Sequence, residues 1–229
     1  MVLLSATSAL AAAQADDGGW VWKAPDLAPP VLTGSAPTVD GQLDEVSWTT
    51  AARSDSFLLA DGRGATCRTR LMVLRDEQTL YIGVECFDTA EALQALTARA
   101  GISDPAQALW ADDCVEIFID PTNRRVSYYQ IIGSFRQATW STYLTGVDSP
   151  DPSWRQKYPF AASIGASCWT IEFALPLAMF DRGGQRFSTW AFNVSRTRKD
   201  AELVYWSPVF NSSSHSPETF GTLSGMPTK

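Results

Sequence analysis

The segment "ALWADDCVEIFIDP", residues 108–121, places a tryptophan and an acidic pair directly before a strand-like run. Side chains of a β-strand alternate between the two faces of a sheet. If Val115, Ile117 and Ile119 face a core, then Glu116 lies on the opposite face, toward solvent or a groove. The segment therefore predicts a strand with one buried apolar face and a charged residue on the other.

Other parts of the chain carry similar short strand-like runs. Residues 67–88, "CRTRLMVLRDEQTLYIGVECFD", are typical of a hairpin with a turn at Asp76 to Thr79. Residues 89–100 have helix-forming composition and helical apolar spacing, which predicts a short surface helix. Further strands, separated by Gly, Pro, Asn or Asp clusters, are predicted at 126–132, 137–144, 158–164, 168–174 and 189–196. Many short strands indicate an all-β sandwich or barrel.

The composition fits one domain with a full core. The chain has 229 residues, of which 45% are hydrophobic and 11% aromatic, and all-β domains of this length are often single. The 18 basic and 25 acidic residues give a net charge of −7 without a Lys/Arg cluster, which argues against nucleic acid or an anionic membrane as partner. Beyond the N-terminal stretch no apolar run reaches the roughly twenty residues of a membrane span, so no membrane insertion is predicted.

The N-terminal residues indicate export. Residues 1–15, "MVLLSATSALAAAQA", are apolar and end in small residues, as a signal peptide does, although a positively charged start is lacking. We therefore predict a secreted or periplasmic protein. Residues 16–35 are rich in Pro, Gly and Asp, which favours an extended lead-in.

The cysteines leave two interpretations open. Cys67, Cys86, Cys114 and Cys168 contain no C-x-x-C pair, so a zinc site is not predicted. Disulfides are compatible with an oxidising compartment. Cys67 and Cys86 fall on the two arms of the predicted hairpin, where they form either a disulfide or two small buried thiols.

No catalytic motif is evident. His215 is the single histidine, lies among serines and is accompanied by no G-x-S-x-G elbow, so a Ser-His-Asp hydrolase is not predicted. Asp112, Asp113, Glu116 and Glu172 offer carboxylates for a glycosidase, but sequence does not give the separation on which that chemistry depends. We therefore predict that the chain is not an enzyme.

Several aspartates are candidate calcium ligands, since carboxylate oxygens suit that ion. No EF-hand pattern is present, and turn caps are the alternative role for these side chains. The candidates are Asp40, Asp44, Asp112, Asp113 and Asp120.

The nine tryptophans say more about function than the aspartates do. An indole offers a flat apolar face that stacks on a sugar while neighbouring polar groups bind the hydroxyls. Trp48, Trp169, Trp190 and Trp206 lie in strand-like or apolar settings, which predicts core positions. The candidates for exposure, beside Pro, Asp, Gly or Ser, are Trp110, Trp140 and Trp154.

Six segments of the chain, at 37–51, 69–88, 109–121, 169–180, 190–198 and 218–223, occur in the same order as in one known family. Through these segments, and over residues 36–224, the chain resembles the family 9 carbohydrate-binding modules. The resemblance implies an antiparallel β-sandwich of the DOMON-like type with one or two short helices and a sugar-binding groove. Such modules often bind structural calcium, but the resemblance implies no required cofactor. It also implies a saccharide ligand and a glycan-degrading enzyme, such as a xylanase, as partner.

The resemblance also implies site residues. Trp110 matches the first of two tryptophans that sandwich a sugar, and Glu116 matches a sugar-binding glutamate. Gln130 and Asn211 match amides of the site. Ser214 occupies the place of the second tryptophan.

Replacements for the missing groups are available nearby. Ile132 stands where the family has a basic residue, and Arg136 follows four positions later. Two alternatives remain for the second wall: either Trp110 acts alone as a one-sided platform on the flank of a sugar chain, or another aromatic residue, Tyr129 or Trp140, replaces the second ring.

We therefore predict non-catalytic carbohydrate binding by an exported module that assists polysaccharide degradation, with a dissociation constant in the micromolar to millimolar range. The alternative is a structural or protein-interaction sandwich that has lost the sugar site. A third hypothesis is a haem-binding redox module, whose axial ligands would come from His215, Met72 and Met179.

Overall fold

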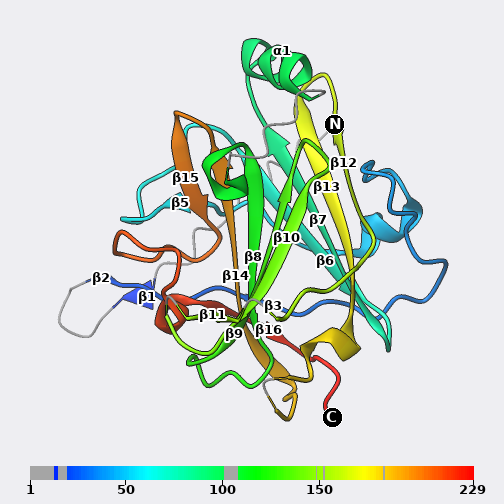
Figure 1. The fold of residues 1–229 in the computed structure, drawn as a ribbon, viewed down its shortest axis with the longest axis vertical. Coiled ribbons are helices and arrows are strands. Elements are labelled where there is room, and N and C mark those ends of the chain that lie inside the picture. The colour runs from blue at the N-terminus through cyan, green and yellow to red at the C-terminus, as the bar shows by residue number, and fades with distance from the viewer. Residues whose placement is uncertain (1–12, 15–19, 101–107, 148, 152, 183) are drawn as a thin grey trace, which may run out of the picture.

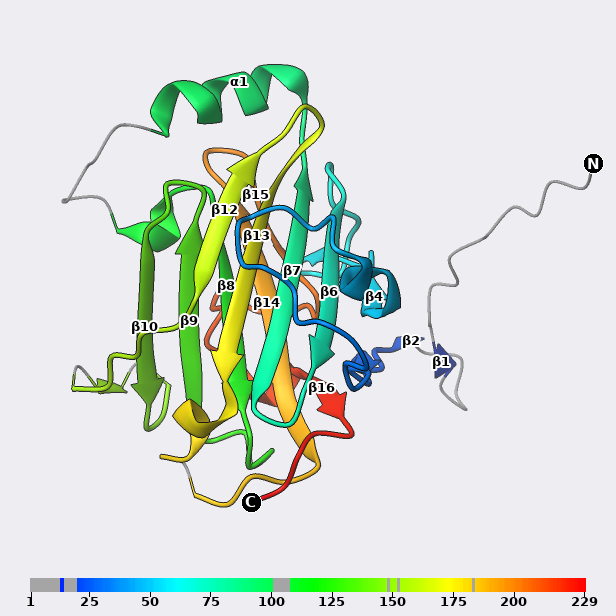
Figure 2. The same ribbon diagram turned by 90° about the vertical axis from the view of Figure 1, so that its right-hand side faces the viewer.

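The computed structural model describes residues 13–14, 20–100, 108–147, 149–151, 153–182 and 184–229. The predicted signal peptide lies outside the described residues except for its Ala13–Gln14 pair. In the described part, no helix is long and apolar enough to cross a membrane. Two β-sheets pack face to face, and a single α-helix, α1 (Ala90–Arg99), lies across one end of them (Figure 1, Figure 2).

The larger sheet carries the segment 108–121. Its strand order is β11 (Pro150–Asp151), β10 (Thr139–Leu144), β9 (Tyr128–Ser134), β8 (Cys114–Asp120), β14 (Thr189–Arg198), β15 (Glu202–Tyr205) and β5 (Leu58–Leu59). At the other end of β14, β16 (Gly221–Ser224) pairs with it and with β3 (Asp26–Leu27). The β3–β16 pair is parallel, in contrast to the antiparallel pairing expected throughout.

The smaller sheet has the order β12 (Phe160–Ile164), β13 (Cys168–Pro176), β7 (Thr79–Phe87), β6 (Thr69–Arg75) and β4 (Ala52–Ser54). A separate pair joins β1 (Ala13–Gln14) to β2 (Trp20–Val21). The short 3-10 helices are η1 (Val46–Thr50), η2 (Leu109–Ala111), η3 (Leu177–Phe180) and η4 (Pro217–Thr219).

The predicted all-β sandwich is confirmed. The strand predicted at 114–120 is β8, the predicted hairpin is β6–β7, and the predicted helix is α1, which Thr89 caps by accepting from the Ala92 N–H. Strand ends differ by a few residues: β9 starts at Tyr128 and β14 continues to Arg198. Strands of two to four residues, such as β15 and β16, were not predicted, because they carry too little alternation to be recognised.

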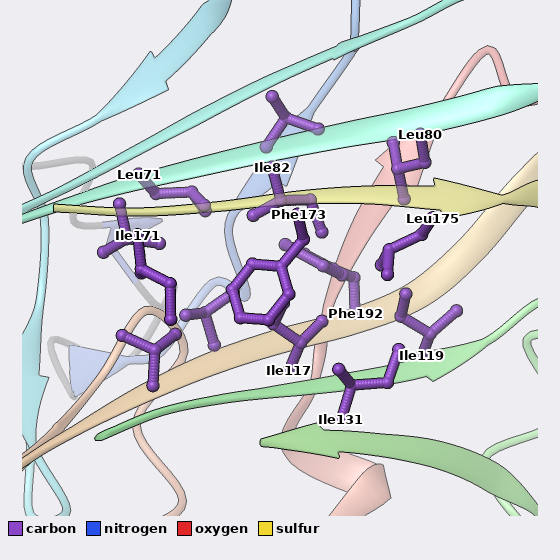
Figure 3. Close-up of a cluster of buried hydrophobic side chains, with 14 of the residues drawn as sticks. Leu71, Leu80, Ile82, Ile117, Ile119, Ile131, Ile171, Phe173, Leu175 and Phe192 are labelled. Carbon is purple, nitrogen blue, oxygen red and sulfur yellow. The ribbon is translucent and has the colours of Figure 1, made fainter. Parts of the chain in front are cut away.

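The core is the layer between the sheets. Val115, Ile117 and Ile119 of β8 point into it, as their alternation predicts, and are completely buried. Figure 3 shows Ile117 and Ile119 facing Phe173 of the smaller sheet. Gly133 of β9 permits this close packing, because a Cβ there would lie 2.6 Å from the Phe173 ring.

The tryptophans divide largely as predicted. The four core candidates are 2% exposed or less, whereas Trp110 is 57% exposed. The prediction that Trp154 is exposed is wrong, because this ring is 4% exposed and packs against Tyr129, with ring centres 4.9 Å apart. It fills the end of the core beneath a loop, which is the usual fate of a large aromatic side chain.

Glu172 ties the N-terminal segment to the smaller sheet. Its carboxylate accepts hydrogen bonds from the N–H of Gly41 (2.7 Å), the N–H of Asp40 (3.0 Å) and the Trp48 indole (3.0 Å). Gly41 has φ +90°, and a Cβ there would lie 2.7 Å from the Ala162 backbone. The segment "VDGQLDEVSW" thus forms a cover over the outer face of β13.

A buried arginine joins the two sheets. Arg196 of β14 is fully buried, and its guanidinium binds the Phe87 carbonyl (2.9 Å) and the Asp88 carboxylate (3.0 Å) of the smaller sheet's side. Arg198 also binds Asp88 at 2.7 Å. Burial would raise the pKa of Asp88, but the hydrogen bonds from Arg198 and Thr89 and the two arginine charges outweigh it, so this pKa is lowered.

The described structure has four free cysteines. Cys86 is buried and stands opposite Thr69 in the hairpin, while Cys67 is half-buried beside Asp88. Burial raises the pKa of the Cys86 thiol to about 12, so it stays protonated at neutral pH.

We expect Asp88→Asn to destabilise the protein by about 3 kcal/mol, because it leaves the buried Arg196 without its counter-charge. Urea unfolding followed by circular dichroism measures this change. Asp61→Asn, which breaks only an exposed pair with Arg63, is the control and should leave the midpoint unchanged. Equal midpoints for the two variants would contradict the role given to Asp88.

Candidate functional site

The candidate site lies on the outer face of the larger sheet. Strand register places one side chain from each of five neighbouring strands in a row across this face, in the order Trp140, Ile132, Glu116, Ser195, Tyr205. Directly paired residues share a face, so these five side chains point the same way. The outward direction predicted for Glu116 from alternation is confirmed.

Glu116 forms a buried polar floor with its neighbours. The side chain of Glu116 is 4% exposed, and the Gln130 amide donates to its carboxylate at 2.6 Å. Burial raises the pKa of Glu116 to about 7, more than the hydrogen bond from Gln130 lowers it. Beside it, the Ser195 hydroxyl is buried and has no hydrogen-bond partner among the described residues. An unpaired buried hydroxyl is costly, and a polar ligand would supply its missing partner.

Trp110 lies on the turn that precedes the strand of Glu116. It belongs to η2, which leads into β8 and packs on β8 and β9, the two strands that carry Glu116 and Gln130. Its side chain is 57% exposed. The exposed indole thus offers an apolar face at the end of β8 from which the floor begins.

Two arginines hold the turn that carries Trp110. Arg99, at the end of α1, binds Asp112 and Asp113 at 2.6 Å each. Arg136, in the turn after β9, binds Asp112 at 2.7 Å and the Arg99 carbonyl at 2.9 Å. We call these four side chains the arginine clamp. Burial would raise the pKa of Asp112, but the Asp113 N–H and the two arginines outweigh it and lower that pKa.

The clamp changes the interpretation of two predicted roles. Arg136, predicted as an additional contact to the sugar, binds Asp112 and so helps to position the turn. Asp112 and Asp113 do not fit calcium ligands, because their charges are already balanced by arginines. The described residues contain no group of three His, Cys, Asp or Glu side chains arranged to hold a metal.

Two of the remaining calcium candidates, Asp40 and Asp120, accept hydrogen bonds from backbone N–H groups and so cap turns. Asp120 accepts hydrogen bonds from the N–H groups of Thr122 (2.9 Å) and Arg125 (2.7 Å), and Asp40 accepts from the Gln42 N–H (2.8 Å). These bonds match the alternative role considered for them in the sequence.

The loop 206–220, which we call the closing loop, folds over the same outer face. Ser214 binds the Tyr205 hydroxyl at 3.1 Å, and His215 binds the Tyr128 hydroxyl at 2.8 Å. Arg125 anchors the end of the loop by donating to the carbonyls of Phe220 (2.6 Å) and Pro217 (2.9 Å). The loop therefore forms a wall of the site beyond Tyr205.

The structure separates the predicted site residues into groups. Glu116 and Gln130 are in direct contact, and Trp110 lies on η2, the turn that leads into the strand of Glu116. The Asn211 side chain is exposed, but its amide is used inside the closing loop, donating to Ser216 (2.7 Å) and accepting from Ser213 (2.8 Å).

The two aromatic alternatives lie on opposite faces. Trp140 is on the outer face, in the row of Glu116, half-buried, with the Arg155 guanidinium 4.9 Å from its ring centre. Tyr129 points into the core, where it packs against Tyr143 and Trp154, and so it does not reach the site. Strand alternation explains the difference, because Tyr129 shares its parity with the core residue Ile131.

Two floor residues were missed in the sequence. Ser195 and Tyr205 lie next to Glu116 in the row, from β14 and β15. The signal for Ser195 was present in "WAFNVS", 190–195, where Asn193 and Ser195 alternate with apolar residues. Tyr205 had no comparable signal, because β15 is short.

The haem ligands proposed from sequence do not come together. His215 lies on the outer face of the larger sheet, bound to Tyr128. Met72 packs with Trp48 on the outer face of the smaller sheet, and Met179 lies in the core. One iron cannot be held from these three places.

A family model described as "Carbohydrate family 9 binding domain-like" matches residues 39–224 of the chain. The chain belongs to this family. The curated relatives include the endo-1,4-beta-xylanase A of Thermotoga maritima, 23% identical over 193 residues, and that of Thermotoga neapolitana, 23% identical over 196 residues. Each match covers 82% of this chain and 17% of the relative. This family 9 module therefore corresponds to a small part of each xylanase.

Solved structures share the fold of this family 9 module. A family 9 module from Caldicellulosiruptor kristjanssonii, in complex with cellotriose, has a TM-score of 0.59 at 12% identity and covers 87% of this chain and 93% of its own. A family 9 module from the same organism in complex with glucose has a TM-score of 0.56 at 12% identity, and the match covers 88% of this chain and 95% of that one. The structure of a putative carbohydrate-binding protein from Bacteroides uniformis has a TM-score of 0.61 at 16% identity, and the match covers 88% of this chain and 98% of that one.

Glu116 should make the stability of this module pH-dependent. Its pKa of about 7 lies above the usual 4.5, so the folded state binds this proton more tightly than the unfolded chain. This stabilisation is fully present below the unfolded pKa and is lost as the pH rises through about 7. Between about pH 4 and pH 8, the free energy of unfolding should fall by roughly 3 kcal/mol more in the wild type than in Glu116→Gln.

Urea unfolding at the two pH values measures this difference. Glu172, whose pKa burial also raises to about 7, is present in both proteins and cancels in the comparison. Identical pH slopes for wild type and variant would refute the assignment.

The arginine clamp should control both stability and the order of Trp110. We expect Arg99→Met to cost about 2 kcal/mol, since it leaves two largely buried carboxylates with a single remaining arginine. The fluorescence anisotropy of Trp110 should also fall in Arg99→Met. The contribution of Trp110 is obtained as the difference between proteins that retain this tryptophan and proteins that lack it. Arg63→Met, at an exposed pair, is the control, and an unchanged anisotropy in Arg99→Met would contradict the positioning role.

Proposed function

We propose that the chain binds carbohydrate without catalysis, on the outer face of the larger sheet. The observation that carries this proposal is an exposed Trp110 on the turn that leads into β8, together with the buried polar floor that Glu116 of β8 forms with Gln130 and Ser195. The indole stacks on the apolar C–H face of a sugar ring, while the floor exchanges hydrogen bonds with its hydroxyls. A site with few such contacts binds with a dissociation constant of micromolar to millimolar order.

The solved relatives favour a glucose-type ligand, since their descriptions name glucose and cellotriose. The xylanase relatives favour a role beside an enzyme that degrades polysaccharides. Such a role operates where the polysaccharide is, which agrees with the secreted or periplasmic location predicted from residues 1–15.

The bonding partners of the candidate carboxylates support binding without catalysis. A glycosidase needs two carboxyl groups facing one site, about 5 to 10 Å apart. Asp112 and Asp113 are engaged by arginines, and Glu172 lies on the other sheet, bound to Trp48. Of the four carboxylates considered as glycosidase candidates, Glu116 is therefore the one that lies on the polar floor without an arginine or an indole as partner.

One observation favours the alternative of an interaction sandwich without a sugar site. Ser214, at the place of the family's second tryptophan, is a small side chain tied to Tyr205. No ring opposes Trp110 from that position. A protein surface would then occupy the outer face in place of sugar.

Titration with sugars distinguishes the two functions. We expect glucose or cellotriose to change the tryptophan fluorescence saturably, and Trp110→Ala to weaken binding at least tenfold, about 1.4 kcal/mol, because the stacking face is lost. Isothermal calorimetry provides an independent measurement. Phe187→Ala, which removes another exposed aromatic ring, is the control. A flat response of the folded wild type to a panel of sugars would favour the interaction sandwich.

A further inference from the structure

A second exposed aromatic group lies where the closing loop meets the edge strand β5. Phe210 is 50% exposed and Trp22 is 37% exposed. Their ring centres are 5.8 Å apart and the rings meet edge to face. We call this pair the edge platform. Single exposed rings are common, but two adjoining ones need a reason.

The backbone holds Phe210 in an unfavourable conformation. Its φ is +55°, in the left-handed region that bulky residues rarely occupy. The Phe210 N–H donates to the Ala60 carbonyl at 2.7 Å, and its ring lies over Gly62, where a Cβ would be 3.3 Å away. The fold therefore keeps this ring at the surface by specific contacts, at a cost in strain that glycine would avoid.

The edge platform extends the row that contains Glu116. Leu58 of β5 pairs with Tyr205, the last residue of that row, and Ala60, which binds the Phe210 N–H, directly follows the end of β5 at Leu59. From Glu116 on β8 to Leu58 on β5 the sheet advances by three strands, roughly 14 Å. Figure 1 shows the closing loop beside β5, with η2 further along the same sheet. This span exceeds one sugar ring, so a ring that bonds to Glu116 does not also cover the edge strand β5.

We propose that the edge platform is a second sugar-stacking subsite, and that the ligand is a linear β-linked glycan of at least three sugar units. One unit stacks on Trp110 above Glu116, and a later unit stacks on Phe210. The exposed polar side chains of Asn211 and Ser212 lie next to Phe210 in the closing loop and face the solvent that such a chain would displace. Affinity then increases with the length of the glycan. This inference rests on the proposed function.

Trp22 makes the lead-in part of the site. It lies outside residues 39–224, the part that matches the family model. The lead-in is held by β3, where Asp26 accepts from the hydroxyls of Thr222 and Ser224 (2.5 Å and 3.0 Å). The edge platform thus joins Phe210, inside the region that matches the family model, to Trp22, which lies before it.

The test compares glucose, cellotriose and cellohexaose by calorimetry. We expect the wild type to bind cellohexaose at least tenfold more tightly than glucose. Phe210→Gly should lose this gain and keep the wild-type affinity for glucose. Glycine accepts φ +55°, so this variant is expected to fold. Trp22→Ala should reduce the gain in part, and Phe187→Ala, at another exposed ring, should leave it unchanged.

The outcomes separate the inference from the function on which it rests. Equal wild-type affinities for glucose and cellohexaose, or a length gain retained in Phe210→Gly, would overturn the second subsite and leave carbohydrate binding at Trp110 intact. No binding of any sugar by the folded wild type would overturn both. A wild-type dimer in sedimentation that becomes a monomer in Phe210→Gly would assign the edge platform to self-association instead.

Discussion

The burial of two apolar sheet faces against each other governs the rest of this structure. It requires strict alternation along β8, with Val115 and Ile117 inward and Glu116 outward. A slip of one residue would place the carboxylate between the sheets and the branched side chains in the groove. The same alternation that builds the core therefore also builds the polar floor, and neither can be altered independently of the other.

The buried carboxylates differ in how their charge is balanced. Asp88 and Asp112 each receive two arginines, which hold their pKa values low. Glu172 accepts three N–H groups and fastens a loop. Glu116 has the neutral Gln130 amide as its assigned donor, and its pKa rises to about 7. The first three fit structural roles, whereas the environment of Glu116 suits a group that meets a polar ligand.

Much of the fold could be predicted from local pattern, because long strands such as β8 and β13 carry clear runs of apolar residues. Short strands and loop packing depend on distant contacts, so β15 and the burial of Trp154 escaped prediction. In the site, alternation placed Glu116 correctly and would also have assigned Tyr129 to the core. The capture of Arg136 by Asp112 and the strained backbone of Phe210 arise from tertiary contacts without a local sequence signal.

The parallel pairing of β3 with β16 has a consequence for biosynthesis. Asp26 meets Thr222 and Ser224 across nearly two hundred residues, and β16 also completes the ladder of β14. The larger sheet therefore cannot close on the ribosome before residue 224 has been released. Until then β14 lacks its β16 partner over residues 189–192, and because contacts between residues so far apart in the sequence form slowly, completion of the larger sheet is a late step of folding.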